Sequence, residues 1–348
     1  MRIEPTMRAL ADPTRLRVMR LLSAMELAVG ELAHVLGQSQ PRVSRHVAIL
    51  CDAGLAERHK EGSWVFLRSA LAAPDDGKLA RAVSSLLAAA EAEDSEFADQ
   101  CAADRRLLAQ IRDTRERHAA DYFARHAAEW DKLRDLLTPA DQVEDALVEV
   151  LSSEPLGQVL DIGTGTGRIA ELLADNKGLG ADHIVALDKS PEMLRLARAK
   201  LQSLPTGEVE LVQGDFGALP FADAVFDTVV FHQVLHYASE PAYALAEASR
   251  VTRPGGRIAI VDLAAHTQED LRRTHAHARL GFEDAQMVRM LESHGFDPAP
   301  VQRLDGGELA VSIWTGRRMG SSVTRIDSGV ASAVPSISRQ NTRKTQRR

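Results

Sequence analysis

Apolar residues along the first seventy positions recur at helical spacing, in short stretches that end at glycine or proline. Over residues 16–36 they follow the period of a helix, and Ser39 with Pro41 supplies the N-cap and first-turn proline of a further helix. Gly54 ends that helix. Residues 55–67 then place apolar positions on both sides of a polar centre, which predicts two strands and a turn. This order of elements predicts a winged helix-turn-helix.

A long, almost uninterrupted helix is predicted next, because residues 77–136 are rich in Ala, Leu, Glu and Arg and nearly free of Gly and Pro. Its positions 91–118 are strongly charged and hold few apolar residues. A helix with so narrow an apolar stripe usually needs a partner helix, so we expect two subunits to pair here, with a solvated linker helix as the alternative. The stripe consists of Leu79, Val83, Leu86, Leu87 and Ala90, followed by Phe97, Leu107, Leu108 and Ile111.

From residue 158 onward the pattern changes to short Val, Ile and Leu runs that alternate with helical stretches. Apolar strands separated by helices are typical of a parallel sheet covered on both faces, an α/β fold. Two last strands, near 297–304 and 308–315, are joined by the turn Asp305–Gly307, which predicts an antiparallel edge. After Arg318 apolar residues are few, and we expect a disordered basic tail. The five apolar runs are 159–163, 183–188, 209–215, 226–231 and 257–263.

A glycine-rich loop follows the first of these runs, directly after Asp161. Gly163, Gly165 and Gly167 let the backbone turn sharply and approach a ligand, and the helix after them offers free N–H groups. A dinucleotide fingerprint would need Gly or Ala in place of Arg168, and a phosphate loop would need Gly-Lys-Ser/Thr. Both fail on spacing, so we expect another nucleotide-like ligand at the carboxyl ends of the strands.

The loop resembles the glycine motif of the seven-stranded, S-adenosylmethionine-dependent methyltransferases, and further pieces of that family follow in order. The resemblance implies a Rossmann-like fold that binds S-adenosylmethionine or S-adenosylhomocysteine through Asp161 and the three glycines. It also implies that Asp188 accepts hydrogen bonds from the ribose hydroxyls. Asp215 and Phe216 would bind the adenine amino group and ring, and His232 would lie beside the sulfonium.

Methyl transfer needs no covalent catalyst, because an acceptor held in line with the activated methyl group reacts directly. His275 and His277 suggest a lid over an acceptor pocket with a general base, and His232 is a further weak catalytic candidate. Histidines at the surface or behind the pocket are the more common explanation. Upstream, Tyr122 and Trp130 either pack against the methionine half of the ligand or only cap the core. No metal is expected, since no third ligand stands at a diagnostic spacing.

Missing residues disfavour several acceptors. Phe231–Gln233 stands where amino methylation of DNA bases would need an Asn/Asp-Pro-Pro-aromatic tetrad. Neither Cys51 nor Cys101 lies in this region to serve as the nucleophile of cytosine C5 methylation, and two cysteines are too few for an arsenic site. We therefore expect neither base modification nor arsenite methylation.

The N-terminal segment resembles the ArsR family of winged-helix repressors in three stretches, 10–17, 39–46 and 54–66. The resemblance implies binding to a double-stranded DNA operator. Members of that family often sense metals through a Cys-x-Cys before the turn, but residues 26–31 hold no cysteine, so metal sensing there is not expected.

The side chains expected to contact DNA fall into two groups. Polar residues on the second helix are placed to reach base edges in a major groove, whereas others are better placed for phosphates. The first group is Gln40, Ser44 and Arg45; the second is Arg42, Arg58, Lys60 and Ser63. His46 would join either group or only pack.

The formal net charge of −7 divides into regions of different sign. Residues 1–70 carry ten basic and seven acidic side chains, residues 71–316 carry 24 and 41, and residues 317–348 carry eight and one. The positive start suits DNA, and the acidic centre suits a cationic sulfonium ligand with a ribose diol. No run of 18 apolar residues and no signal-like start is present, so we expect a cytoplasmic protein with no membrane partner.

These patterns together predict four regions: a DNA-binding domain at 1–72, a helical dimerisation or linker region at 73–136, a methyltransferase-like domain at 137–318 and the tail at 319–348. The favoured hypothesis is a homodimeric transcriptional regulator, a repressor, whose effector is the nucleoside ligand. The alternative is an active methyltransferase on a small molecule with an attached DNA-binding domain. The operator, the methyl acceptor and the sign of the ligand effect stay open.

Overall fold

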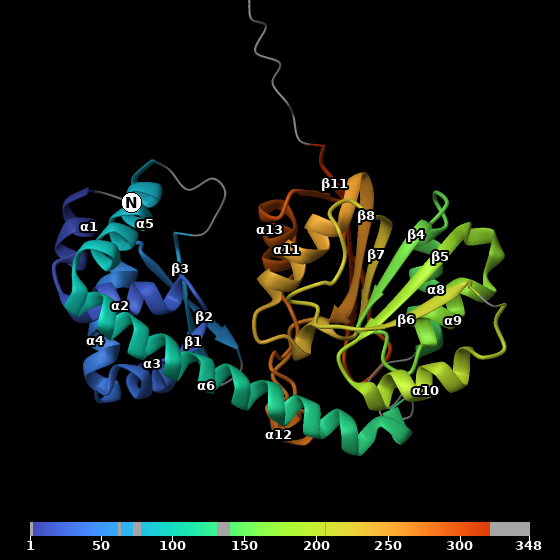
Figure 1. Ribbon diagram of the computed structural model, residues 1–348, viewed down its shortest axis with the longest axis horizontal. Coiled ribbons are helices and arrows are strands. Elements are labelled where there is room, and N and C mark those ends of the chain that lie inside the picture. Colours follow the sequence, from blue (N-terminus) through green and yellow to red (C-terminus); the bar gives the residue numbers. More distant parts are fainter. Residues whose placement is uncertain (1–2, 62–63, 72–77, 131–139, 206, 321–348) are drawn as a thin grey trace, which may run out of the picture.

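The computed structural model describes residues 3–61, 64–71, 78–130, 140–205 and 207–320, so the predicted tail lies outside the described residues. Figure 1 shows two domains side by side, with the long helix α6 running from one to the other. We call residues 3–71 the N-terminal domain and residues 140–320 the C-terminal domain.

The N-terminal domain packs helices against a small antiparallel sheet of order β1-β3-β2. Helix α4 begins after Ser39 with Pro41 in its first turn, and Gly54, just after its end, has a φ of +69°. Glycine takes this left-handed conformation without strain, so the chain reverses there into β2. The predicted winged helix-turn-helix is confirmed. Its elements are α1 (Ile3–Leu10), α2 (Pro13–Leu22), β1 (Leu27–Ala28), α3 (Val29–Leu36), α4 (Gln40–Asp52), β2 (Ala56–Glu61) and β3 (Trp64–Ser69).

The predicted long helix is two helices, α5 (Lys78–Glu93) and α6 (Ser95–His126), followed by the short η1 (Ala127–Glu129). The break is at Asp94, whose carboxylate accepts the Phe97 N–H at 3.0 Å and caps α6. An aspartate in this role favours a helix start over a helix interior. A single helix was therefore the wrong prediction, because composition does not show where a side chain turns back on the backbone.

The apolar stripe of these helices packs within the chain. Val83, Leu87 and Leu108 belong to the hydrophobic core of the N-terminal domain, whereas Leu86 is 45% exposed, contrary to its predicted place in the stripe. On α6, Asp104 accepts two hydrogen bonds from the Arg17 guanidinium of α2, at 2.8 and 2.6 Å. Most of the apolar surface of α5 and α6 thus already has a partner within the chain. Pairing of subunits through these helices stays a prediction.

The C-terminal domain is a twisted sheet of order β10-β11-β8-β7-β4-β5-β6 with helices on both faces (Figure 1). Helices α8, α9 and α10 cover one face and α11 and α13 the other, each with its own apolar core. The predicted α/β, Rossmann-like fold with an antiparallel edge is confirmed. Its strands are β4 (Gly157–Ile162), β5 (Ala181–Asp188), β6 (Val209–Gln213), β7 (Phe226–His232), β8 (Thr252–Leu263), β9 (Phe296–Pro298), β10 (Gln302–Leu304) and β11 (Val311–Arg318). Its helices are α8 (Ala140–Leu151), α9 (Arg168–Asp175), η2 (Lys177–Leu179), α10 (Pro191–Leu201), η3 (Leu235–Tyr237), α11 (Pro241–Val251), α12 (Asp270–Thr274) and α13 (Asp284–Ser293).

The antiparallel edge differs from the prediction in one respect. The strand expected at 297–304 is two short strands, β9 and β10, which pair with opposite ends of β11. Pro298 and Pro300 lie at and after the end of β9. Proline lacks the N–H that a continuous ladder needs, so the strand divides at this point. The five parallel strands are unaffected, and their carboxyl ends meet at one edge.

Candidate ligand site and DNA-binding face

The glycine loop joins β4 to α9 and is held against β5. The Gly163 and Thr164 N–H groups donate to the Leu187 carbonyl oxygen at 2.8 and 3.0 Å. All three glycines have positive φ, and a methyl group on Gly163 would lie 2.3 Å from Val234 Cγ2. The side chain of any other residue would therefore clash at Gly163 and be strained. The loop leaves its backbone open towards the cavity.

Asp188 at the end of β5 is held by backbone amides. Its Oδ2 accepts the Gly165 N–H and its Oδ1 accepts the Ser190 N–H, both at 2.8 Å. Burial raises the pKa of Asp188, and these amide hydrogen bonds oppose the rise. Each oxygen keeps acceptor capacity for a further donor, so the carboxylate can take a diol while staying fixed to the loop.

Asp161 lies beneath the same loop and is 1% exposed. Burial raises its pKa to about 7, and the nearby charge of Asp188 adds to the rise. A carboxyl group with a pKa of about 7 is partly protonated at neutral pH, and Asp161 borders the cavity in this state.

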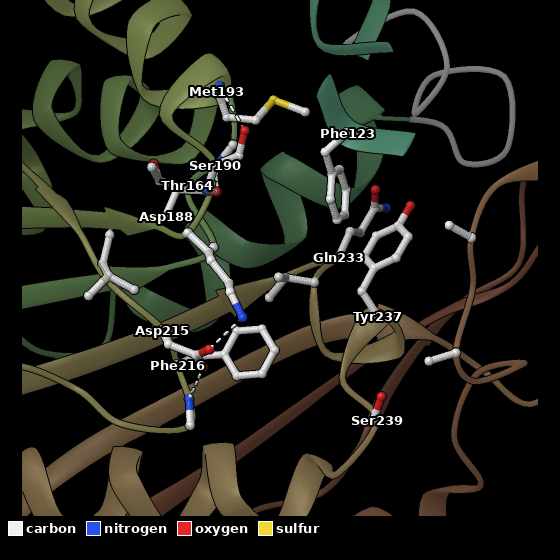
Figure 2. A pocket seen from close by; sticks show the side chains of 18 of the residues that line it. Phe123, Thr164, Asp188, Ser190, Met193, Asp215, Phe216, Gln233, Tyr237 and Ser239 are labelled. Carbon is white, nitrogen blue, oxygen red and sulfur yellow. Dashed lines mark hydrogen bonds and ion pairs between the residues drawn. The ribbon is translucent and has the colours of Figure 1, made fainter. Parts of the chain in front are cut away.

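Asp215 and Phe216 follow β6 and face the same cavity (Figure 2). Asp215 accepts hydrogen bonds from Lys189 Nζ and from the Gly217 N–H, each at 2.8 Å. Burial alone would raise the pKa of Asp215, but these hydrogen bonds outweigh it and lower the pKa. A ligand amine at Asp215 would share the carboxylate with Lys189.

One cavity of about 840 Å³ joins these groups, within the size range of small-molecule sites. All the predicted ligand residues that belong to the loop and strand ends border it, except Gly167, which lies behind it as the N-cap of α9. The cavity extends beyond them to Phe66 and Glu31 of the N-terminal domain and to Arg112 of α6. Residues from both domains therefore form its wall.

An aromatic group lines the middle of the cavity. Phe123, Trp130 and Tyr237 border it, with ring centroids 4.8 Å apart for Phe123–Tyr237 and 5.3 Å for Phe123–Trp130. Tyr122, for which a lining role and a capping role were both open, is 4% exposed and packs behind them. Successive residues of a helix point in different directions, so Tyr122 and Phe123 cannot both face the cavity. Phe123 is the one that does. Trp130, for which packing on the ligand and capping of the core were both open, borders the cavity, and Phe123 was not among the predicted residues.

The end of β7 brings His232 and Gln233 to the cavity wall. Gln233 has a φ of +51°, which is strained for a residue other than glycine, and its N–H donates to the Val261 carbonyl oxygen at 2.7 Å. Figure 2 shows its side chain next to Phe123 and Tyr237. Such strained residues cluster at functional sites, and sequence alone shows no sign of this one.

A buried carboxylate–histidine pair stands directly behind this wall. His236 Nδ1 lies 2.6 Å from Asp262 Oδ1, and Asp262 Oδ2 accepts the Leu235 and His236 N–H groups at 2.8 and 3.2 Å. This arrangement places the proton on Nδ1 and orients the ring. Asp262 was missed, although a charged residue inside an otherwise apolar strand was a visible signal.

Of the two lid histidines, only His277 borders the cavity. His277 is 3% exposed, burial lowers its pKa, and its Nδ1 has no hydrogen-bond partner among the described residues. His275 lies behind it and shares a 2.8 Å hydrogen bond with Thr274 Oγ1. Burial lowers the pKa of His266, which lies in the same segment, to about 4. The cavity wall thus includes an imidazole whose lowered pKa favours the neutral form and whose Nδ1 is buried without a hydrogen-bond partner among the described residues.

On the N-terminal domain, the predicted DNA contacts of α4 lie on one open face. Gln40, Arg42, Ser44 and Arg45 are exposed, and so is Arg58 on β2. His46 is turned inward, with its Nδ1 3.7 Å from Asp12 Oδ1, so it packs. The Lys60 side chain and Ser63 lie outside the described residues. An exposed helix face of this kind can enter a major groove.

Membrane-spanning helices and clusters of metal ligands are both absent from the described ranges. No helix there is long and apolar enough to cross a membrane. Nor do three His, Cys, Asp or Glu side chains come together there as metal ligands.

Two known protein families match parts of the chain. Residues 12–58 match the family described as bacterial regulatory protein, arsR family, and residues 160–260 match the methyltransferase domain family. The chain joins an ArsR-family helix-turn-helix to a methyltransferase domain.

Individual proteins resemble only part of the chain. The demethylmenaquinone methyltransferase of Renibacterium salmoninarum is 34% identical over 157 residues, which cover 44% of this chain and 62% of that protein. The arsenite methyltransferase of Halobacterium salinarum is 30% identical over 167 residues, or 46% and 42% of the two chains. The crystal structure of a SAM-dependent methyltransferase from Aquifex aeolicus matches with a TM-score of 0.43 at 21% identity, covering 53% of this chain and 97% of that one. The chain spans less than two thirds of the length of these two curated relatives.

Proposed function

We propose that this chain is a DNA-binding transcriptional regulator, acting as a repressor, whose methyltransferase domain binds S-adenosylmethionine or S-adenosylhomocysteine as its effector. The observation that carries the proposal is the shared cavity: the groups suited to the nucleoside and two residues of the DNA-binding domain, Phe66 and Glu31, border one space. A ligand there can change the relation between the domains.

The residues present fit such a nucleoside. In the proposal, Asp188 accepts hydrogen bonds from the ribose hydroxyls, Phe216 packs on the adenine ring and Asp215 binds its amino group. Gly163 and Gly165 border the cavity, and the ligand's methionine half would lie against them, with His232 and Trp130 near its sulfur. No metal is part of the proposed site.

The regulator acts in the cytoplasm as a homodimer, because helix-turn-helix proteins read two-fold operators with two copies. Residues 1–72 bind DNA, 73–136 connect or pair subunits and 137–318 bind the nucleoside. Sedimentation velocity of the full chain with and without DNA measures the dimer directly.

Fluorescence anisotropy tests the effector role. The full-length chain is titrated into a labelled duplex that it has selected from a random-sequence library, first alone and then with each nucleoside at saturation. We expect the DNA dissociation constant to change by about tenfold or more with at least one nucleoside, a usual size for allosteric coupling. Equal binding in all three conditions rejects the regulator as proposed.

A second candidate function is methyl transfer to a small molecule. It is favoured by the aromatic lining of Phe123, Trp130 and Tyr237 beyond the nucleoside groups, and by the Nδ1 of His277, which has no hydrogen-bond partner among the described residues. S-adenosylmethionine would supply a methyl group activated by its positive sulfur. The chain's own residues would hold the acceptor between the rings, exclude water and accept a hydrogen bond from it at His277. Incubation with methyl-labelled S-adenosylmethionine and a panel of metabolites measures turnover; labelled product supports an enzyme, and tight nucleoside binding without product favours the sensor.

A further inference from the structure

Beside the cavity, three hydrogen bonds between described residues join the two domains. Tyr243 Oη donates to the Ala24 carbonyl oxygen at 2.8 Å, and the Glu26 N–H donates to Glu240 Oε1 at 2.8 Å. Arg279 Nη1 donates to Glu26 Oε2 at 2.6 Å. Residues separated by more than 200 positions in the sequence thus form one polar contact between the domains.

Arg279 is the most buried charge of this contact, with its side chain 6% exposed. Its Nη2 donates to the Ser239 carbonyl oxygen at 2.7 Å, and its backbone N–H donates to the His236 carbonyl oxygen at 2.9 Å. The guanidinium also lies 5.4 Å from the ring centroid of Phe66. The same side chain therefore contacts Ser239, which follows η3 and borders the ligand site, and Phe66 of β3, which belongs to the wing of the DNA-binding domain.

Arg279 stands in a segment that is closed at its base and reaches the cavity at its tip. We call residues 264–282 the lid segment. Ala265 N–H donates to the Phe282 carbonyl oxygen at 3.0 Å, and a methyl group on Gly281 would lie 2.3 Å from the Ala264 carbonyl oxygen. Ala276, His277, Ala278 and Arg279 at its tip border the cavity. Arg279 itself borders the cavity, so a ligand there meets the same side chain that pairs with Glu26.

We propose that Arg279 of the lid segment transmits occupancy of the cavity to the DNA-binding domain through its ion pair with Glu26 and its stacking on Phe66. This inference rests on the regulator proposed above and names the contact through which ligand binding changes DNA binding. A buried charge cannot leave its partner gradually, because an unpaired buried charge is costly, so the contact is either made or broken. Such a two-state contact is what ligand and DNA can both bias.

The coupling must be reciprocal if this route operates. A nucleoside that changes DNA affinity by a given factor is itself bound more or less tightly, by the same factor, when DNA is present. The test therefore measures both quantities on the full-length chain: DNA affinity by anisotropy with and without S-adenosylhomocysteine, and S-adenosylhomocysteine affinity by isothermal titration with and without the selected duplex. For the unaltered chain we expect the two factors to agree at about tenfold or more.

Two variants remove the contact from the side of the DNA-binding domain. Glu26→Gln keeps the size of the side chain and removes the charge that pairs with Arg279, and Phe66→Leu removes the aromatic face beneath it. We expect each to reduce both coupling factors to about twofold or less. Glu93→Gln, an exposed glutamate at the end of α5, is the matched control and should keep the full factors. Thermal melting identifies a variant that does not fold, in which case the other one decides.

The outcomes separate the route from the function. Coupling that is present in the unaltered chain and unchanged in folded Glu26→Gln and Phe66→Leu overturns the Arg279 route but leaves the regulator standing. No coupling in the unaltered chain, with either nucleoside at saturation, overturns the regulator and the route together. Loss of both factors in the two variants, with the control unaffected, supports both.

Discussion

The two domains hold their functional polar groups in opposite ways. Along α4, Arg42, Ser44 and Arg45 stand exposed on a helix whose other face is buried. In the C-terminal domain, Asp161 and Asp188 are buried or nearly so, and burial raises the pKa of both. A DNA-binding surface must stay open to meet a large partner, whereas a nucleoside site must be enclosed to bind a small one.

This difference predicts how each domain responds to mutation. An exposed side chain has few neighbours, so its loss weakens binding without disturbing the fold. A buried carboxylate is tied to the backbone around it, so its loss also affects the loop that it holds. A mutation of the polar groups in one domain should therefore leave binding by the other domain unchanged. A mutation at the contact between the domains should affect both.

The largest expected effect is on nucleoside binding by Asp188→Ala. The change removes the acceptor of the Gly165 and Ser190 amides and of the proposed ribose hydrogen bonds. We expect at least a hundredfold weaker S-adenosylhomocysteine binding, about 3 kcal/mol, by isothermal titration, with DNA affinity of the nucleoside-free chain unchanged. Asp182→Ala, at an exposed position of the same strand, is the control. Simultaneous loss of DNA binding would contradict the separation of the domains.

Next in size is the effect of Gly163→Ala on stability. The added methyl group meets Val234 Cγ2 at 2.3 Å, and the residue has a φ of +73°. The clash and the left-handed conformation together should lower the free energy of unfolding by about 3 kcal/mol and weaken nucleoside binding. Gly255→Ala has a similar φ, +80°, with nothing near the added group, so it isolates the backbone cost. Equal losses in the two variants by chemical denaturation would show that the packing against Val234 is unimportant.

Replacing Arg45 with alanine addresses the open face. We expect a loss of about 1 to 3 kcal/mol in affinity for the selected duplex, because a side chain at a base edge is removed. Nucleoside binding should stay unchanged in the same preparation. Arg81→Ala, an exposed arginine on α5, controls for the loss of positive charge alone. An equal loss in both variants would point to non-specific attraction in place of base contacts.

The smallest effect concerns pH. The pKa of His266 is about 4 in the folded chain, below its ordinary value of 6.5, because of burial. As pH falls from 6.5, the unfolded chain takes up a proton before the folded chain does, so this histidine's contribution to stability is complete above 6.5 and lost towards pH 4. His266→Gln should therefore remove about 1 kcal/mol of the loss in the free energy of unfolding between pH 6.5 and pH 4. The expected value is this small because solvent partly screens the site.

Asp161 changes the free energy of unfolding with pH in the opposite direction. The pKa of Asp161 is raised to about 7, so its contribution to stability increases as pH falls from 7. The difference between His266→Gln and the unaltered chain at each pH isolates the histidine. His34→Gln, at an exposed position on α3, should leave the unfolding curve in urea unchanged at every pH. A parallel offset of His266→Gln at all pH values would mean that only packing was lost.

Periodicity and turn residues predicted most of the fold because they act locally. The five parallel strands, the glycine loop, the recognition helix and the hairpin all follow from short patterns. The errors were also local in origin: Asp94 caps a new helix, and Pro298 and Pro300 divide a strand. In each case a single residue type acts on the backbone and overrides the average of its neighbours.

The candidate site divides in the same way. Asp161, Asp188, Asp215 and Phe216 stand at the ends of predicted strands, so the sequence placed them at one edge. Phe123 was missed beside Tyr122, and His275 was expected to face the cavity where His277 alone does. Which side of a helix or loop faces a ligand depends on packing against elements far away in the chain.

The sequence by itself determined two domains, their fold classes and the order of the groups suited to a nucleoside and to DNA, since each depends on residues close together in the chain. Only the tertiary structure decided that Phe66 and Glu31 complete the wall of the ligand cavity and that Arg279 pairs with Glu26. Burial and long-range contact are set by how separate elements pack, and a pattern of apolar and polar positions does not contain that information.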